Sequence, residues 1–69
     1  MIKIGDAVVV GCQVNDKFVS SLFSAKVALV HFDSSTHRTQ IDLDWGTFGK
    51  SKVYLDDENK VWKQIGKHN

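Results

Sequence analysis

Apolar and polar side chains alternate along the stretch Arg38-Thr39-Gln40-Ile41-Asp42-Leu43-Asp44-Trp45. Successive side chains of an extended chain point to opposite sides, so the apolar residues at positions 41, 43 and 45 share one face. The polar residues between them share the other face. This period of two predicts a strand with one buried and one solvent-exposed face.

Apolar runs on both sides of this stretch predict further strands. The nine valines and four isoleucines cluster in short runs separated by Gly, Asn, Asp and Ser, which is the pattern of strands joined by turns. We expect the strand at 26–32 to be central and buried on both faces, because its apolar residues cover both sides. In the last strand, Val61 and Ile65 are expected to point inward and Trp62 outward. The predicted strands are 7–14, 26–32, 38–45, 52–55 and 61–65.

Turn-forming residues punctuate these strands. Asn15-Asp16 closes the first strand, and the residues at 46–49 predict a hairpin between the third and fourth strands. The acidic residues at 56–59 are interpreted as a single helical turn or a tight loop. The segment from Phe18 to Phe23 has apolar residues spaced by four, as on a helix, but we interpret it as an irregular β excursion in a long first connection.

Composition limits the size and the class of the protein. The chain has 69 residues and a mass of 7.8 kDa, of which 42% are hydrophobic and 25% charged, with a net charge of +1. These values fit one small globular domain and exclude a disordered or heavily charged chain. A barrel of this size fills its interior with its own side chains, so we expect a protein that is not an enzyme.

The sequence also bears on location and on cofactors. Its longest apolar runs, 7–10 and 27–30, are far shorter than the roughly 18 residues of a membrane-spanning helix, so we expect no membrane contact. Without an export signal and with Cys12 as the lone cysteine, a cytoplasmic location is expected. His31, Asp33 and His37 are side chains of the zinc-ligand type, but no second cluster supports them, and we expect neither a metal nor a cofactor.

Five short strands, a long first connection and an acidic turn before a short last strand resemble the SH3-like small barrels, which include Tudor-like and chromo-barrel modules. The resemblance covers about residues 5–65 and concerns strand order and loop length, so it implies no functional residue. The stretch 51–62 also resembles segments of small bacterial proteins. The expected fold is therefore all-β, a five-stranded SH3-like small barrel forming one domain over 1–69, with a frayed tail at 66–69.

Aromatic and acidic residues gather in the second half of the sequence and predict a binding surface. Aromatic faces attract cations, and carboxylates add Coulomb attraction. Alternation places Tyr54 and Trp62 outward, an arrangement that commonly anchors interfaces, whereas Trp45 is expected in the core or at its rim. We therefore expect recognition of a protein or peptide with a cationic group; in the alternative, both outward rings only cover the end of the barrel. The expected partner-binding residues are Tyr54, Trp62, Phe48, Asp42, Asp44, Asp56 and Asp57.

An apolar excess in the first connection suggests self-association. Four large apolar residues there exceed what one small barrel needs, and an exposed apolar patch usually marks an interface. We expect a homo-oligomer through this segment; in the alternative, the segment folds over the mouth of the barrel. The expected interface residues are Phe18, Val19, Leu22 and Phe23.

A nucleic-acid-binding barrel is the alternative function. Residues 50–69 hold five lysines against three acids, and small barrels often bind nucleic acids through a basic face with stacking aromatics. Lys50, Lys52 and Lys63 would form that face beside Tyr54 and Trp62. The excess of positive charge is weaker than in dedicated nucleic-acid-binding domains, so protein recognition is the leading hypothesis.

Overall fold

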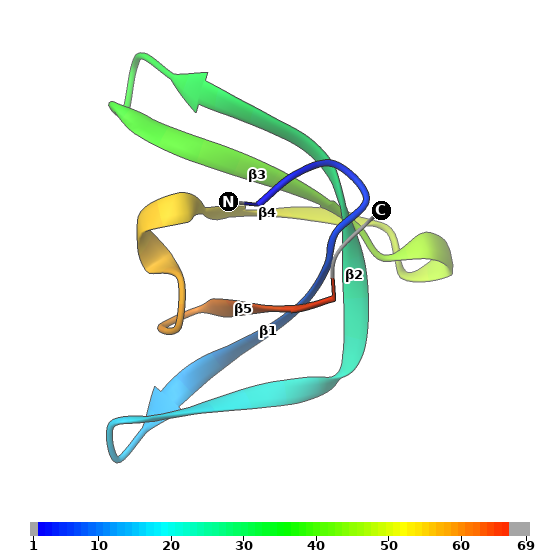
Figure 1. Cartoon of the computed structure of the whole chain (residues 1–69), viewed down its shortest axis with the longest axis vertical. Coiled ribbons are helices and arrows are strands. Elements are labelled where there is room, and N and C mark those ends of the chain that lie inside the picture. The colour runs from blue at the N-terminus through cyan, green and yellow to red at the C-terminus, as the bar shows by residue number, and fades with distance from the viewer. Residues whose placement is uncertain (1, 67–69) are drawn as a thin grey trace.

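The computed structural model describes residues 2–66 and shows an all-β chain of five antiparallel strands (Figure 1). The strands lie in one sheet in the order β4-β3-β2-β1-β5. Two short 3-10 turns, η1 and η2, flank β4. The elements are β1 (Ala7–Val14), β2 (Lys17–Asp33), β3 (Arg38–Asp44), η1 (Gly46–Phe48), β4 (Lys50–Tyr54), η2 (Leu55–Asp57) and β5 (Trp62–Gly66).

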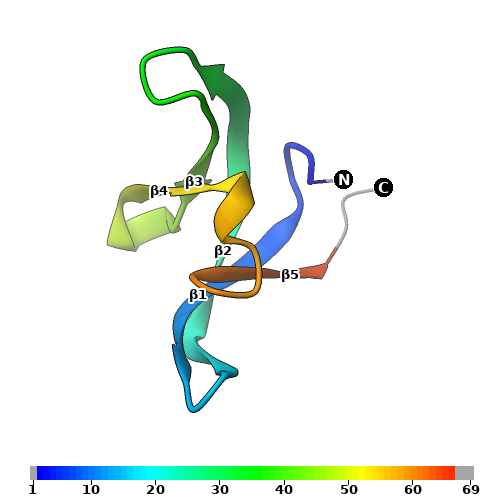
Figure 2. The ribbon, with the colours of Figure 1, turned by 90° about the vertical axis from the view of Figure 1, so that its left-hand side faces the viewer.

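Two hairpins extend toward opposite ends of the molecule, as both ribbon views show (Figures 1 and 2). The β1–β2 hairpin turns at Asn15 and Asp16, whose φ angles are 51° and 65°. Positive φ at both central residues is the requirement of the tight turn that matches the twist of the two strands. The β2–β3 hairpin turns at 34–37, where the Asp33 carboxylate accepts hydrogen bonds from Ser35 N–H and Oγ. The predicted turn at Asn15-Asp16 is confirmed.

The first connection is shorter than the sequence suggested. The segment from Phe18 to Phe23 belongs to β2, and Phe18 and Val19 lie opposite Gln13 and Cys12 of β1. Only Asn15 and Asp16 lie between the two strands. The segment is extended, as expected, but the prediction of a long first connection is wrong, because the tight turn lets β2 pair at once.

The core lies on one side of the sheet. Its buried residues come from β1, β2, β3, β4, β5 and the N-terminal segment, and the partly buried Val10, Val30, Trp45 and Leu55 pack against them. The predicted inward orientation of Ile41 and Leu43, and the position of Trp45 in the core or at its rim, are thereby confirmed. The buried hydrophobic residues are Ile2, Val8, Ala25, Val27, Ile41, Leu43, Val53 and Trp62.

The central strand is not buried on both faces. Val27 of β2 is 2% exposed, but Leu29, which follows the irregularity in the β2–β3 ladder and lies opposite Asp42, is 46% exposed. A single antiparallel sheet that curls around one core has only one interior face, and the other faces the solvent. The apolar residues on the outer side of β2 therefore remain exposed to solvent.

The last strand has the opposite orientation from the one predicted. Trp62 is fully buried, whereas Val61 and Ile65 are 37% and 55% exposed. Trp62 pairs with Val10 of β1, which packs against the core. Because side chains alternate along a strand, a shift of one residue exchanges the two faces, and the large indole takes the inner position.

The sheet is not closed into a barrel, since no ladder joins the edge strands β4 and β5 within residues 2–66. One hydrogen bond links them instead: the indole N–H of Trp62 donates to the carbonyl oxygen of Tyr54 at 2.7 Å. The all-β, five-stranded prediction is confirmed, whereas the closed barrel is not. The expected fraying of 66–69 lies, from residue 67 on, outside the described residues.

A buried carboxylate joins the N-terminal segment to the last strand. Asp6 is 0% exposed, and its Oδ2 accepts hydrogen bonds from the backbone N–H of Lys3 at 2.9 Å and from the Gln64 side-chain amide at 3.0 Å. A buried polar group needs such partners because it has lost its hydration. This arrangement holds the two ends of the described chain together.

Candidate functional site

Trp62, the first of the two expected outward aromatic anchors, lies in the core. Its side chain is fully buried, and its only polar atom donates to Tyr54 O. A residue with no exposed surface contacts no partner, so its assignment to a binding surface is wrong. Its role is to fill the interior and to fasten β5 to the end of β4.

Tyr54, the second, is covered by a cation from the same chain. The guanidinium carbon of Arg38 lies 3.9 Å from the centre of the Tyr54 ring, which is the geometry of a cation–π contact. The Nζ of Lys52 lies 6.0 Å from the same ring. The aromatic face that was expected to attract a cationic ligand therefore holds Arg38.

The acidic turn η2 also binds Arg38. The guanidinium donates two hydrogen bonds to Asp56 Oδ1, at 2.9 and 3.1 Å, and one to Asp57 Oδ2, at 2.8 Å. Arg38 lowers the pKa of Asp56 below its ordinary value, chiefly through these hydrogen bonds. Tyr54, Asp56 and Asp57 do lie together as the sequence suggested, but they hold an internal cation; we call Arg38, Tyr54, Asp56 and Asp57 the arginine clamp.

The other two expected acids lie on β3 and have partners there. Asp42 accepts a hydrogen bond from the Gln40 amide at 2.7 Å and lies 3.5 Å from His31 Nε2. Asp44 accepts the backbone N–H of Gly46 at 2.8 Å and so shapes the start of η1. These contacts give both acids structural roles within the sheet.

The lysines of the alternative function are spread over the two edge strands. Lys50 and Lys52 lie on β4 opposite Asp44 and Asp42, whereas Lys63 lies on β5 opposite Val9 of β1. Each lysine of β4 therefore faces an acid across the ladder. The sheet order puts β4 and β5 at its two ends, and this placement gives little support to a single basic stripe.

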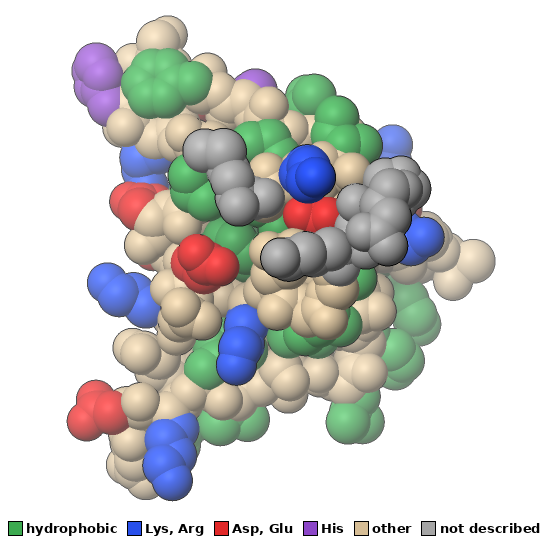
Figure 3. All heavy atoms as spheres, viewed as in Figure 1, with side chains coloured by type: hydrophobic (Ala, Val, Ile, Leu, Met, Phe, Trp, Pro, Cys, Tyr) green, Lys and Arg blue, Asp and Glu red, His purple; other side chains and the backbone are tan. Residues whose placement is uncertain are grey.

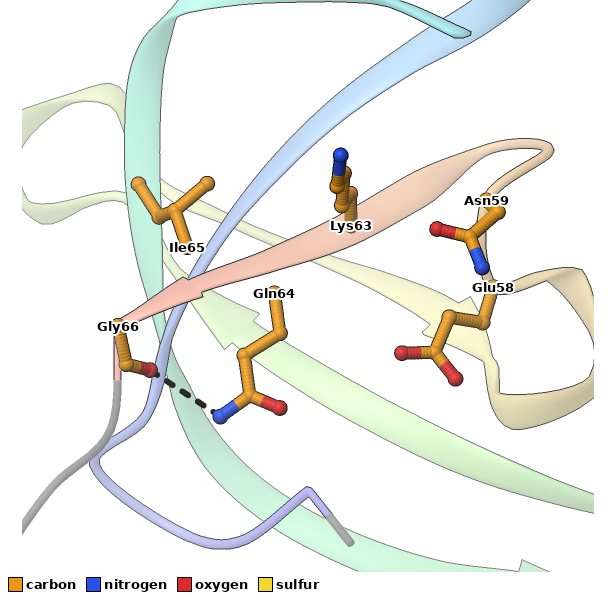
Figure 4. Close-up of a pocket in the computed structure, with 6 residues that line it drawn as sticks. All are labelled: Glu58, Asn59, Lys63, Gln64, Ile65 and Gly66. Atoms are coloured by element: carbon orange, nitrogen blue, oxygen red, sulfur yellow. Dashed lines mark hydrogen bonds between the residues drawn. The ribbon is translucent and has the colours of Figure 1, made fainter.

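Lys63 instead borders a hollow beside β5, drawn in Figure 4. Lys63 and Ile65 point to one side of the strand and Gln64 to the other, where its amide donates to Gly66 O at 3.2 Å. Glu58 and Asn59 close the far side. The same Gln64 amide donates to Asp6, so the polar group at the centre of this hollow serves the fold.

Phe48 is the predicted partner-binding aromatic that does face the solvent. It ends η1, which contributes no buried residue, and is 73% exposed. Its ring lies against Phe23 of β2, with centroids 5.2 Å apart and planes at 49°. Phe23 is 58% exposed and the neighbouring Leu22 is 98% exposed. We call these three residues, Leu22, Phe23 and Phe48, the open patch.

The open patch unites two sets of residues that the sequence kept apart. Phe48 was expected at the partner surface, and Leu22 and Phe23 at an oligomer interface. Figure 3 shows hydrophobic side chains along the lower right-hand edge of the molecule, the side on which β2 runs in Figure 1. The other two expected interface residues lie nearer the turn of the β1–β2 hairpin. Phe18 is half-buried, and Val19 is 51% exposed.

An irregularity in the β1–β2 ladder presents Leu22 and Phe23. Val9 pairs with Ser24 and Gly11 with Ser20, so the three residues 21–23 of β2 bulge out opposite a single residue of β1. A Cβ at Gly11 would lie 2.0 Å from Val19 O, far closer than two non-bonded heavy atoms can approach. Glycine at position 11 is therefore required where the two strands meet beside the bulge.

A hollow of about 350 Å³ lies next to the open patch along the sequence, although no residue of the patch lines it. Ser24, which follows Phe23, lies on one side of it, and Gly46, the first residue of η1, lies on the other. Its rim carries one cation, Lys26, and one anion, Asp44, which pair across the β2–β3 ladder. The lining residues are Ala7, Ser24, Ala25, Lys26, Asp44, Trp45 and Gly46.

Residues 2–66 hold neither a candidate metal-binding group nor a membrane-spanning helix. Among these residues, no three His, Cys, Asp or Glu side chains gather as a metal-binding group. None of the helical segments in this part of the chain has the length and hydropathy needed to cross a bilayer. Comparison with protein families, curated protein sequences and solved structures found no significant match to this chain.

Proposed function

We propose that the protein is a non-enzymatic interaction module that binds a protein or peptide partner through the open patch. The observation that carries this proposal is the exposure of Leu22 and Phe48, 98% and 73%, on two elements that meet through the Phe23 ring. Each exposed large apolar side chain lowers the solubility of the protein and contributes little to the packing of the core. Clustered exposed apolar residues with an aromatic centre are typical of protein interfaces.

The arginine clamp supports this choice of surface. A partner with a cationic group would have to displace Arg38 from three hydrogen bonds and from the Tyr54 ring. No such competition exists at the open patch, where the rings of Phe23 and Phe48 offer only apolar area. We therefore propose an apolar or aromatic side chain of the partner as the group that is recognised there.

The strand order supports a finer proposal for the fold. The order β4-β3-β2-β1-β5, with a 3-10 turn before the last strand, fits a partly open member of the SH3-like small barrels. We propose the cytoplasm as its location, since the only cysteine, Cys12, is an exposed free thiol and free thiols persist best in a reducing compartment.

Selection from a display library of random peptides tests the function. The protein is kept at nanomolar concentration, and enriched peptides are assayed against Leu22→Asp and Phe48→Asp. We expect both substitutions to abolish binding, and the matched control Phe32→Asp, at another 62% exposed site, to leave it unchanged. Failure to enrich any peptide, or binding that depends on Phe32 alone, contradicts the proposal.

The nucleic-acid alternative predicts a different result, which an oligonucleotide-binding assay on the same protein can detect. Binding of a single-stranded oligonucleotide that weakens steeply with salt and is lost in the double variant Lys50→Gln, Lys52→Gln would favour it. We expect no such binding, because both lysines face acids across the β3–β4 ladder.

A further inference from the structure

A projecting side chain of the open patch and a recess lie two residues apart along β2. Leu22 stands at the top of the bulge and is 98% exposed. The hollow of about 350 Å³ begins at Ser24, two residues farther along β2. A surface that carries a projecting side chain beside a recess can fit a rotated copy of itself, with each projection in the other recess.

Two-fold symmetry makes this arrangement informative. In a symmetric dimer the same patch contacts itself, so residue i of one copy meets residue j of the other and j meets i. Such a patch must contain both complementary parts. The Leu22 projection and the neighbouring hollow meet this requirement, whereas a partner of another kind would need only one of them.

The charges at the rim satisfy the same rule. Lys26 and Asp44 are the charged residues that line the hollow, and they carry opposite charges. A two-fold axis between them places Lys26 of each copy near Asp44 of its partner, so both contacts are attractive. A two-fold contact between two β4 edges, by contrast, would place Lys50 and Lys52 of one copy against the same lysines of the other, and these like charges repel.

We propose that a second copy of this chain occupies the open patch, with each Leu22 seated in the other copy's hollow and Lys26 paired with Asp44 across the interface. This inference rests on the proposed function, because it names the partner of the same surface. The result is a symmetric dimer in which the Phe23 and Phe48 rings of the two copies cover each other.

Sedimentation from micromolar to millimolar concentration tests the dimer. We expect the wild-type chain to move from 7.8 kDa toward twice that mass. Leu22→Asp should remain at the monomer mass, because it places a charge in the recess, while the matched control Lys63→Asp on β5 should associate like the wild type. A wild-type chain that stays monomeric throughout overturns the inference.

Charge reversal gives a sharper test of the pairing. In Lys26→Asp both rim positions are acidic, and in Asp44→Lys both are basic, so each variant should lose self-association by roughly tenfold or more. An equimolar mixture of the two variants should form a dimer again, because every cross-interface pair is then one Asp and one Lys. Circular dichroism of each variant verifies the fold, which matters for Asp44→Lys because Asp44 binds Gly46 N–H.

The outcomes separate this inference from the function on which it rests. A monomeric wild-type chain whose selected peptides still depend on Leu22 and Phe48 leaves the binding module in place and removes the second copy. A dimer that is insensitive to Leu22→Asp, or a mixture of the two reversed variants that fails to associate, places the contact elsewhere and overturns the inference.

Discussion

The arginine clamp and the open patch are both built around aromatic rings, yet they differ in what surrounds those rings. Tyr54 has a guanidinium on its face and a carbonyl that accepts the Trp62 indole. Among the residues that the structure describes, the Phe23 ring contacts the Phe48 ring, and both side chains are more than half exposed. The first region is complete within the chain, whereas the second has apolar surface that nothing in residues 2–66 covers.

This difference shows which feature marks a binding surface in so small a protein. Polar side chains that resemble a ligand-binding group in the sequence can also form hydrogen bonds and ion pairs with one another when the chain folds. Large apolar side chains on a bulge and a 3-10 turn form no such internal hydrogen bonds. Unsatisfied apolar area, more than the number of aromatic and acidic residues, therefore points to the partner.

The largest effect is expected from Trp62→Ala in the closed region. Removing a fully buried indole costs about 3–5 kcal/mol, and a core of this size supplies only about 3–5 kcal/mol of net stability. We expect an unfolded chain by circular dichroism. Trp62→Phe, which keeps a ring but loses the bond to Tyr54 O, should fold with a lower urea midpoint. A Trp62→Ala chain with the wild-type midpoint would contradict the buried position.

A smaller loss is expected from Gly11→Ala, which tests how the open region is presented. The new methyl group would meet the Val19 carbonyl, so the strands beside the bulge must separate at a cost of about 1–3 kcal/mol. Urea unfolding measures the loss. Gly66→Ala is the matched control, because its Cβ would meet only the Ala7 methyl at an ordinary 3.5 Å. Equal midpoints for the two variants would show that the close approach at Gly11 is absent.

The arginine clamp predicts a smaller, pH-dependent effect. The folded pKa of Asp56 lies below its ordinary value because of Arg38, so its contribution is present above the unfolded pKa, near 3.9, and is lost as pH falls through the folded pKa. NMR titration of the Asp56 carboxyl carbon should show this lowered pKa. In Arg38→Ala the pKa should rise toward the ordinary value; an unchanged pKa would mean that the clamp does not form in solution.

The smallest effect on stability is expected in the open region itself. Leu22→Ser and Phe48→Ser alter side chains that are largely exposed, and such substitutions usually change the unfolding free energy by no more than about 0.5 kcal/mol. Urea unfolding at micromolar concentration measures this change. A loss near that of Gly11→Ala would assign the two residues to the fold and would remove the contrast between the regions.

Local patterns were sufficient to predict much of the fold. The alternation around Ile41 and Leu43 predicts their burial, because the period of two is a property of the strand itself. The turns at Asn15-Asp16 and in the acidic segment follow from the residues that occupy them. Each of these features is decided within a few residues of sequence.

Features that depend on distant partners were not predicted. The inward position of Trp62 follows from its register with Val10 of β1, which its own five-residue strand does not encode. Arg38 was not anticipated as the partner of Asp56, because they lie 18 positions apart. The contact between Phe23 and Phe48 likewise joins β2 to η1, two elements that β3 separates in the sequence.

The position of Trp62 has a consequence for synthesis of the chain on the ribosome. The largest fully buried side chain belongs to the last strand, and that strand pairs with the first. The four earlier strands therefore emerge with an incomplete core. The hydrogen bond between the Gln64 amide and Asp6 joins positions 58 residues apart and forms late as well. The fold closes only when β5 pairs with β1, which on the ribosome requires residue 62 to have left the exit tunnel, so the contacts that complete the core are long-range and slow to form.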